Sequence, residues 1–166
     1  MMGAGKTAVG RLLAERLGWR YVDSDEQVEA ATGRTVRQIF EQDGEAAFRR
    51  EESAALAAAV ADDSAPSIVS VAGGAVLDPT NRARIADAGT VVWLRAPIDV
   101  LAVRAKEAGG HRPLLDGDDG AEATLARLYE AREPLYAEVA DVVVDVAELM
   151  PDAVVDHLLE RMELHA

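Results

Sequence analysis

Residues 3–7 read Gly-Ala-Gly-Lys-Thr, and this short segment constrains the fold more than any other part of the chain. It matches the closing half of a phosphate-binding loop, G-x-x-x-x-G-K-[ST], which leads from a buried strand into the first turn of a helix. Gly3 and Gly5 would let the backbone approach phosphate oxygens. Lys6 could reach the β- and γ-phosphates of a nucleotide, and the Thr7 hydroxyl could bind Mg²⁺. The alternative is a flexible Gly- and Ala-rich N-terminus before an ordinary helix.

The first glycine of that motif would directly precede Met1, and the apolar strand that normally leads into the loop is absent from the sequence. A central parallel strand of about five Val, Ile or Leu residues contributes roughly 8–15 kcal/mol. That amount rivals the entire stability of a domain, about 5–15 kcal/mol. We therefore expect that translation starts upstream of Met1.

Composition narrows the class of protein. The 166 residues, 49% of them hydrophobic, suit a single domain over 1–166 with a full core. The net charge of −13 argues against a nucleic-acid partner, although ATP needs only a local basic pocket. No cysteine is present, and no apolar run approaches the ~20 residues of a membrane span. We expect a soluble cytoplasmic protein, by default a monomer.

Helical and strand patterns alternate along the chain, which predicts an α/β fold with a mostly parallel sheet. The expected strands cover 20–23, 68–71, 90–94 and 142–144. The expected helices cover 6–16, 25–32, 35–40, 45–61, 97–107, 122–133 and 151–162, with another that opens at Asp78-Pro79. A polar, glycine-bounded segment at about 109–120 is expected to be mobile.

Three further groups of residues have both a functional and a purely structural interpretation. Asp23 and Asp25 lie at the end of the first expected strand, where two carboxylates could serve Mg²⁺ and accept a hydroxyl proton. Asp25 could instead simply cap the next helix. The run around Arg49 resembles a solvated helix face with internal ion pairs, and the glycines at 73–74 could form only a turn.

Taken together, the segments resemble the shikimate kinase family over nearly the whole chain. The resemblance rests on D-S-D at 23–25, I-F-x-x-x-G-E-x-x-F-R at 39–49, G-G-A-V at 73–76, R-P-L-L at 112–115 and R-E-P-L-Y at 132–136. It implies a P-loop NTPase-type three-layer α/β sandwich, similar to nucleoside monophosphate kinases, with a parallel sheet of order 2-3-1-4-5. The first strand would be missing from this chain, and residues 109–120 would form a mobile lid.

The resemblance also implies roles for matching residues. Asp23 and Thr7 correspond to the Mg²⁺ site. Asp25 corresponds to the acid that binds the shikimate hydroxyls and lies beside the attacking oxygen. Arg49 and Arg132 correspond to the arginines that hold the substrate carboxylate. The remaining matches are the nucleotide loop (Gly3, Ala4, Gly5, Lys6, Thr7, Ala8), the substrate-contacting turn (Gly73, Gly74), the lid arginine (Arg112) and a segment near adenine (Pro151, with Arg104 a partial match).

The implied reaction is transfer of phosphate from ATP to the 3-hydroxyl of shikimate, with Mg²⁺. The alternatives are a related kinase acting on gluconate or a nucleotide, and a non-catalytic relic with an incomplete phosphate loop. Ala72 replaces the usual first glycine of the turn and could tighten the substrate pocket. The family strand order further predicts two separate parallel pairs, 21–23 with 68–71 and 91–94 with 142–144, flanking an open slot.

Overall fold

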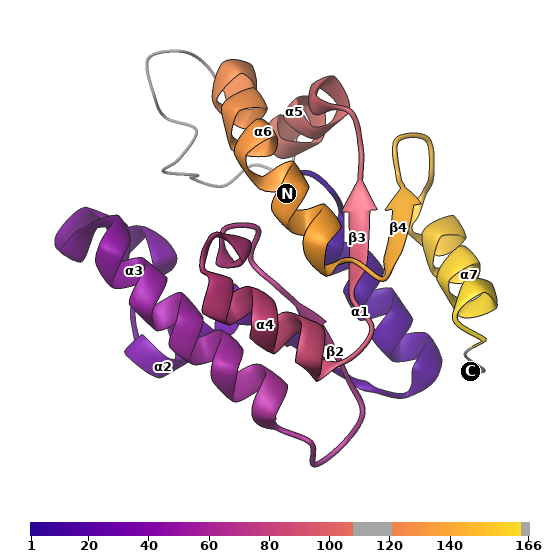
Figure 1. The fold of residues 1–166 in the computed structure, drawn as a ribbon, viewed down its shortest axis with the longest axis horizontal. Helices are drawn as coiled ribbons and strands as arrows, with labels where there is room; N and C mark the ends of the chain where they lie inside the picture. The colour runs from indigo at the N-terminus through magenta and orange to yellow at the C-terminus, as the bar shows by residue number, and fades with distance from the viewer. Residues whose placement is uncertain (108–120, 164–166) are drawn as a thin grey trace.

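The computed structural model describes residues 1–107 and 121–163 of the chain, which form an α/β fold (Figure 1). The strands are β1 (Arg20–Asp23), β2 (Ser67–Ser70), β3 (Val92–Arg95) and β4 (Val142–Asp145). The helices are α1 (Lys6–Leu17), α2 (Ser24–Thr32), α3 (Val36–Ala61), the short 3₁₀ helix η1 (Ala75–Leu77), α4 (Pro79–Ala88), α5 (Ile98–Glu107), α6 (Ala121–Val139) and α7 (Pro151–Arg161). This alternation confirms the predicted fold class.

Helix α1 begins directly after the glycine-rich loop. Its N-cap is Gly5, with a φ of 83°, and its C-cap is Gly18, with a φ of 66°. Both values lie in the left-handed region, which glycine adopts without a steric penalty. Val9 and Leu13, one turn apart on the helix, point into the core. The loop therefore leads straight into a helix, as the motif predicts.

The strands form two parallel pairs instead of one sheet. β1 pairs with β2, from Arg20 opposite Ser67 to Asp23 opposite Ser70, and β3 pairs with β4 in the same direction. Among the described residues, no hydrogen-bonded strand joins β2 to β3. The predicted pairs and the predicted slot between them are both confirmed.

A cavity of about 720 Å³ occupies this slot. Its walls come from residues 67–71 and 91–94, and α1 contributes Val9, Gly10 and Leu13. Ile68 and Val92 pack against the core cluster and are only half-buried. Parallel strands are ordinarily enclosed on both faces by other elements. The cavity therefore leaves apolar side chains of β2 and β3 partly uncovered.

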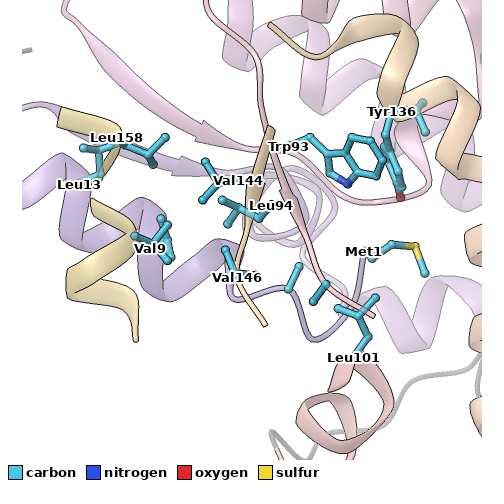
Figure 2. Close-up of a cluster of buried hydrophobic side chains, with 14 of the residues drawn as sticks. Met1, Val9, Leu13, Trp93, Leu94, Leu101, Tyr136, Val144, Val146 and Leu158 are labelled. Carbon is cyan, nitrogen blue, oxygen red and sulfur yellow. The ribbon is translucent and has the colours of Figure 1, made fainter. Parts of the chain in front are cut away.

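The main core joins the β3–β4 pair to helices on its faces (Figure 2). Leu94 and Val144 from the strands pack in one cluster with Leu13 from α1 and Leu158 from α7. A second, smaller cluster lies between α2 and α3, where Val28, Ile39, Phe48 and Ala55 are buried. No helix in the described parts of the chain is long and apolar enough to cross a membrane.

One helical region confirms the sequence prediction and another differs from it. The sequence predicts separate helices over 35–40 and 45–61, and α3 consists of two helical segments that meet at Gly44, whose φ of 80° and ψ of 174° are not helical. The sequence also predicts a helix that ends at Glu133, whereas α6 continues past Pro134 to Val139. Tyr136, in this last part of α6, is buried and bonded to Gly73, so tertiary contacts hold the turn that Pro134 would tend to end. The other element boundaries shift by only a few residues.

Candidate active site

The glycine-rich loop places backbone donors at the N-terminus of α1. Gly3 has a φ of 75°, and a Cβ at this position would collide with the backbone carbonyl of Leu101. The conformation therefore requires glycine at position 3. The Lys6 ammonium donates to the carbonyl oxygen of Met1 at 3.0 Å, so it lies folded over the loop. A helix N-terminus, whose first amides have no acceptor within the helix, is suited together with an adjacent lysine to bind an anion such as phosphate.

Thr7 and Asp23 meet at the hydroxyl of Tyr21. That hydroxyl donates to Asp23 Oδ2 at 3.0 Å, and the Thr7 hydroxyl also interacts with it. Burial, together with the neighbouring Asp23 charge, raises the pKa of Tyr21, so Tyr21 remains a neutral donor. The sequence left open whether Asp25 caps α2. The N-cap is Asp23, whose side chain accepts a hydrogen bond from the Asp25 amide at 3.0 Å.

This donor set fits Mg²⁺ better than a metal caged by protein alone. Among residues 1–107 and 121–163, no group of three or more His, Cys, Asp or Glu side chains could hold a metal ion. Mg²⁺ at kinase sites is commonly bound by one or two protein oxygens, with phosphate oxygens and waters completing the octahedron. One carboxylate and one hydroxyl beside a phosphate-binding loop match that pattern.

Asp25 lies in the first turn of α2, at the solvent-facing mouth of the site. Surrounding protein atoms raise its pKa by desolvating the carboxylate, and the negative charge of Asp23 raises it further. Lys6 and Arg49 act in the opposite direction on the same pKa. The Asp25 carboxyl is therefore close enough to Lys6 of the loop and to Arg49 of α3 for both charges to act on it, and its affinity for protons is raised.

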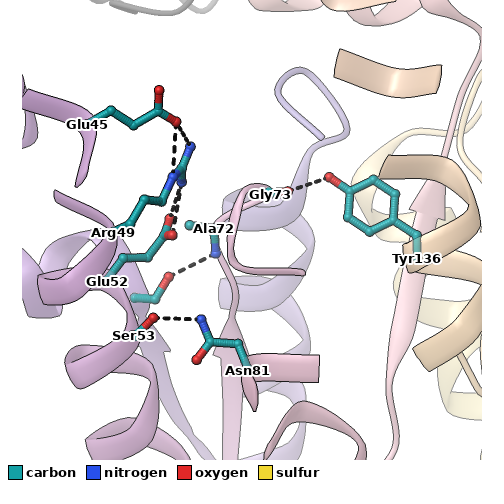
Figure 3. A network of polar contacts seen from close by, with 9 residues as sticks. Glu45, Arg49, Glu52, Ser53, Ala72, Gly73, Asn81 and Tyr136 are labelled. Carbon is teal, nitrogen blue, oxygen red and sulfur yellow. Dashed lines mark hydrogen bonds and ion pairs between the residues drawn. The ribbon is translucent and has the colours of Figure 1, made fainter. Parts of the chain in front are cut away.

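The guanidinium of Arg49 is fixed by two carboxylates of its own helix (Figure 3). Its Nη1 donates to the two oxygens of Glu52 at 3.1 and 2.9 Å, and its Nη2 donates to Glu45 at 2.9 Å. The predicted internal ion pairs of this run are confirmed. One of them is not solvated, however, because the Glu52 side chain is only 2% exposed.

Arg132 comes from α6 and is 4% exposed. Its Nε has no hydrogen-bond partner among the described residues. Burial raises the pKa of the Glu52 carboxyl, and the positive charges of Arg49 and Arg132 both oppose that rise. A buried guanidinium with an unused donor is suited to receive a carboxylate.

The turn at residues 72–74 lies between these groups. The Ala75 amide closes it by donating to the Ala72 carbonyl at 3.1 Å. A Cβ on Gly74 would collide with the guanidinium of Arg49, so α3 and the turn are in direct contact. A Cβ on Gly73 would lie 3.1 Å from the Tyr136 hydroxyl. A Cβ at either position would therefore require a neighbouring side chain to shift, the Arg49 guanidinium at Gly74 or the Tyr136 hydroxyl at Gly73.

A sequence profile for shikimate kinase matches residues 2–163 of the chain. The chain belongs to the shikimate kinase family. A shikimate kinase of Paramagnetospirillum magneticum is 46% identical over 162 residues, which cover 98% of this chain and 80% of that protein. A shikimate kinase of Symbiobacterium thermophilum is 44% identical over 164 residues, covering 98% of this chain and 92% of the relative.

Solved structures of the family share the fold. The shikimate kinase of Bacteroides thetaiotaomicron superposes with a TM-score of 0.89 at 31% identity, covering 98% of this chain and 94% of that one. The Acinetobacter baumannii shikimate kinase in complex with shikimate gives a TM-score of 0.86 at 34% identity, covering 98% and 88%. The P-loop kinase fold expected from the sequence is thereby confirmed.

Several residues that the resemblance singles out lie apart from this cluster or outside the described chain. Arg112 and the rest of the expected lid at 109–120 lie outside the described residues. Pro151 is the first residue of α7. A shallow groove of about 320 Å³ is lined by Arg104, residues of α5 and Ala147, but Pro151 is not among its lining residues. The adenine contacts expected for Pro151 and Arg104 stay predictions.

Two residues at the centre of the site received no role from the sequence. Glu52 is one of two adjacent glutamates in a charge run, and its spacing of three from Arg49 was the available signal. Tyr136 ends the R-E-P-L-Y segment, but a tyrosine on a helix is more commonly a core residue. Nothing in either pattern indicated which neighbour the side chain would contact.

Proposed function

We propose that this chain transfers the γ-phosphoryl group of ATP to the 3-hydroxyl of shikimate, giving shikimate 3-phosphate and ADP. The observation that carries the proposal is the convergence of Asp25, Arg49 and Arg132 around the turn at 72–74, beside the phosphate loop. Two guanidinium groups with one carboxylate acceptor suit a small polyol that carries one carboxylate. The shikimate-bound relative from A. baumannii supports the same substrate.

In this proposal Arg132 and Arg49 bind the substrate carboxylate and so fix the ring. The unused Nε of the buried Arg132 offers a charge-assisted hydrogen bond whose desolvation cost is already met in the folded protein. Arg49 keeps its orientation through Glu52 and Glu45. Holding the acceptor in one pose supplies much of the rate enhancement in phosphoryl transfer, since there is little covalent chemistry for the protein to perform.

Asp25 then orients the 3-hydroxyl and takes its proton. The bond that forms joins the 3-oxygen to the γ-phosphorus, and the bond that breaks joins the γ-phosphorus to the oxygen bridging it to ADP. The raised pKa of Asp25 makes it a better proton acceptor than an ordinary aspartate, and the positive charge of Lys6 opposes that rise. Lys6 and the amides at the start of α1 stabilise the negative charge on the phosphates.

Thr7 and Asp23 would hold Mg²⁺, which would neutralise charge on the β- and γ-phosphates when bound. Tyr21 keeps these two side chains together through its hydroxyl. The nearby Asp25 is left to the acceptor, because Asp23 is the carboxylate that caps α2 and bonds to Tyr21.

A panel assay tests the substrate. The purified chain is supplied with ATP, Mg²⁺ and either shikimate, gluconate or a nucleoside monophosphate, and ADP release is measured. We expect turnover of shikimate with a kcat/KM far above the others. Faster turnover of gluconate or a nucleotide would replace this assignment with a related kinase. No turnover of any acceptor, from a chain that is folded by circular dichroism, would favour the non-catalytic alternative.

A further inference from the structure

Two long-range hydrogen bonds hold the turn at 72–74 from opposite sides. On one side, the Ala72 amide donates to Ser24 Oγ at 2.9 Å, across 48 residues of sequence. On the other side, the Tyr136 hydroxyl donates to the Gly73 carbonyl at 2.7 Å, across 63 residues (Figure 3). Two consecutive residues of the turn are therefore tied to two different helices, α2 and α6.

The Ser24 side chain is enclosed, and its hydroxyl connects α2 to the turn. Ser24 is the first residue of α2, lies between Asp23 and Asp25, and is 0% exposed. Its hydroxyl faces the protein interior, where it accepts a hydrogen bond from the Ala72 amide. The Ser24–Ala72 bond uses the backbone amide of Ala72, so the methyl group that replaces the family's usual glycine does not interfere with it.

Tyr136 is tied to the other side of the site in a similar way. It follows Arg132 by one turn of α6, so the two side chains share one face of the helix. Its ring is buried and packs on Trp93 with the centroids 5.7 Å apart, which leaves the hydroxyl little freedom. The Arg132 guanidinium also interacts with that hydroxyl.

We propose that Ser24 and Tyr136 are positioning residues that fix the position of the turn at 72–74 relative to Asp25 and Arg132. This inference rests on the proposed function of the site. Each anchor is adjacent to one substrate-binding side chain, directly next to Asp25 or one helical turn from Arg132. Gly74 in addition packs on Arg49. A displaced turn would therefore disturb the contacts of the acceptor with the hydroxyl-binding, carboxylate-binding and backbone groups together.

The test combines Ser24→Ala and Tyr136→Phe with two matched controls. Ser53→Ala removes another serine acceptor, bonded to Asn81 at 2.8 Å, and Tyr129→Phe removes another hydroxyl of α6, bonded to Glu133 at 3.2 Å. Each variant is assayed for the KM of shikimate and the KM of ATP. The exchange rate of the Ala72 amide with deuterium is measured by NMR in the ligand-free protein, together with the melting temperature.

Loss of one hydrogen bond corresponds to a change of about 5- to 10-fold. We expect Tyr136→Phe and Ser24→Ala to raise the KM of shikimate by about that factor and to leave the KM of ATP within about twofold. Ser24→Ala should also speed exchange of the Ala72 amide by a similar factor. The controls should leave both KM values and this exchange rate within about twofold. If Ser24→Ala does not fold, Ser24→Cys replaces it, because a thiol is a much weaker acceptor of similar size.

The outcomes separate this inference from the proposed function. Failure of the unaltered chain to phosphorylate shikimate would overturn the proposed function, whereas the exchange measurement needs no substrate. Unchanged Ala72 exchange in Ser24→Ala would overturn the Ser24 anchor. Equal rises in both KM values, or no rise in that of shikimate, would show that the two residues serve only general stability.

Discussion

Arg49 Nη1 lies 2.9 Å from Glu52 Oε2, and this ion pair joins a half-buried guanidinium to a carboxylate that is almost fully enclosed. The same guanidinium lies 2.9 Å from Glu45, whose side chain is 54% exposed against 2% for Glu52. One cation thus has two partners that differ in burial, and the buried partner, Glu52, also interacts with the charge of Arg132. This arrangement allows the effect of burial on an ion pair to be measured within a single site.

Glu52→Ala should lower the free energy of unfolding by about 2–4 kcal/mol, because it leaves a partly buried guanidinium with half of its partners. Glu45→Ala should lower it by less than about 1 kcal/mol, since solvent replaces an exposed partner. Urea denaturation of both variants provides the measurement. Equal losses would mean that Glu52 is hydrated in solution, contrary to its enclosed position.

Arg132→Ala should raise the KM of shikimate about 10- to 150-fold, because a charge-assisted pair contributes about 1.5–3 kcal/mol. The KM of ATP should change little, since Arg132 is assigned only to the acceptor. Arg127→Ala on the same helix is the matched control, because the Arg127 side chain is exposed and donates to the nearby Thr124 hydroxyl at 3.4 Å. A shikimate KM that is unchanged in Arg132→Ala would show that the carboxylate role is wrong.

Asp25→Asn should reduce kcat by several orders of magnitude while ATP binding survives. The amide retains the shape of the side chain but cannot accept the hydroxyl proton, and it lowers the negative charge near the acceptor. Steady-state kinetics with shikimate and titration with a non-hydrolysable ATP analogue separate the two effects. Loss of nucleotide affinity equal to the loss in kcat would instead place Asp25 in the nucleotide site.

The pH dependence of kcat/KM provides a second test of the same carboxyl. Burial and the adjacent Asp23 raise the pKa of Asp25, so the protonated, inactive form persists to a higher pH than for a free aspartate. Activity should therefore fall, as pH is lowered, through a midpoint above the ordinary aspartate value of 3.8. The residual activity of Asp25→Asn should lack this acidic limb. An unaltered limb in that variant would assign the titration to another group.

The elements with strong local signals were predictable from the sequence. Gly18 and Gly33 end helices in the left-handed conformation, Thr35 forms a capping box with Gln38, and Asp78 caps the helix that Pro79 begins. Each of these features depends on residues close in sequence. The two strand pairs came instead from the family resemblance, because periodicity alone does not fix strand order.

What the sequence did not reveal depends on tertiary contacts. Pro134 indicated a helix end, but the burial of Tyr136 and its bond to Gly73 carry α6 further. Glu52 resembled part of a solvated face, whereas it lies enclosed beside Arg49. In both cases a side chain is fixed by surroundings more distant than the local pattern can report.

The slot between β2 and β3 leads to a prediction about the effect of core truncations. Ile68 lines the cavity and is half-buried, whereas Ile39 is 0% exposed in the cluster between α2 and α3. Ile68→Ala and Ile39→Ala delete the same side-chain atoms. The destabilisation caused by such a deletion grows with how closely the deleted atoms were packed and with the volume of the void left behind.

Ile39→Ala should therefore lower the free energy of unfolding by about 3–5 kcal/mol, and Ile68→Ala by less than about 2 kcal/mol. The atoms removed from Ile68 already border a space of about 720 Å³, so they are less closely packed than those removed from Ile39. Urea denaturation at several protein concentrations provides the comparison. Equal losses in the two variants would mean that the slot is filled in solution. A loss for Ile68→Ala that grows with protein concentration would identify a second copy of the chain as what fills it.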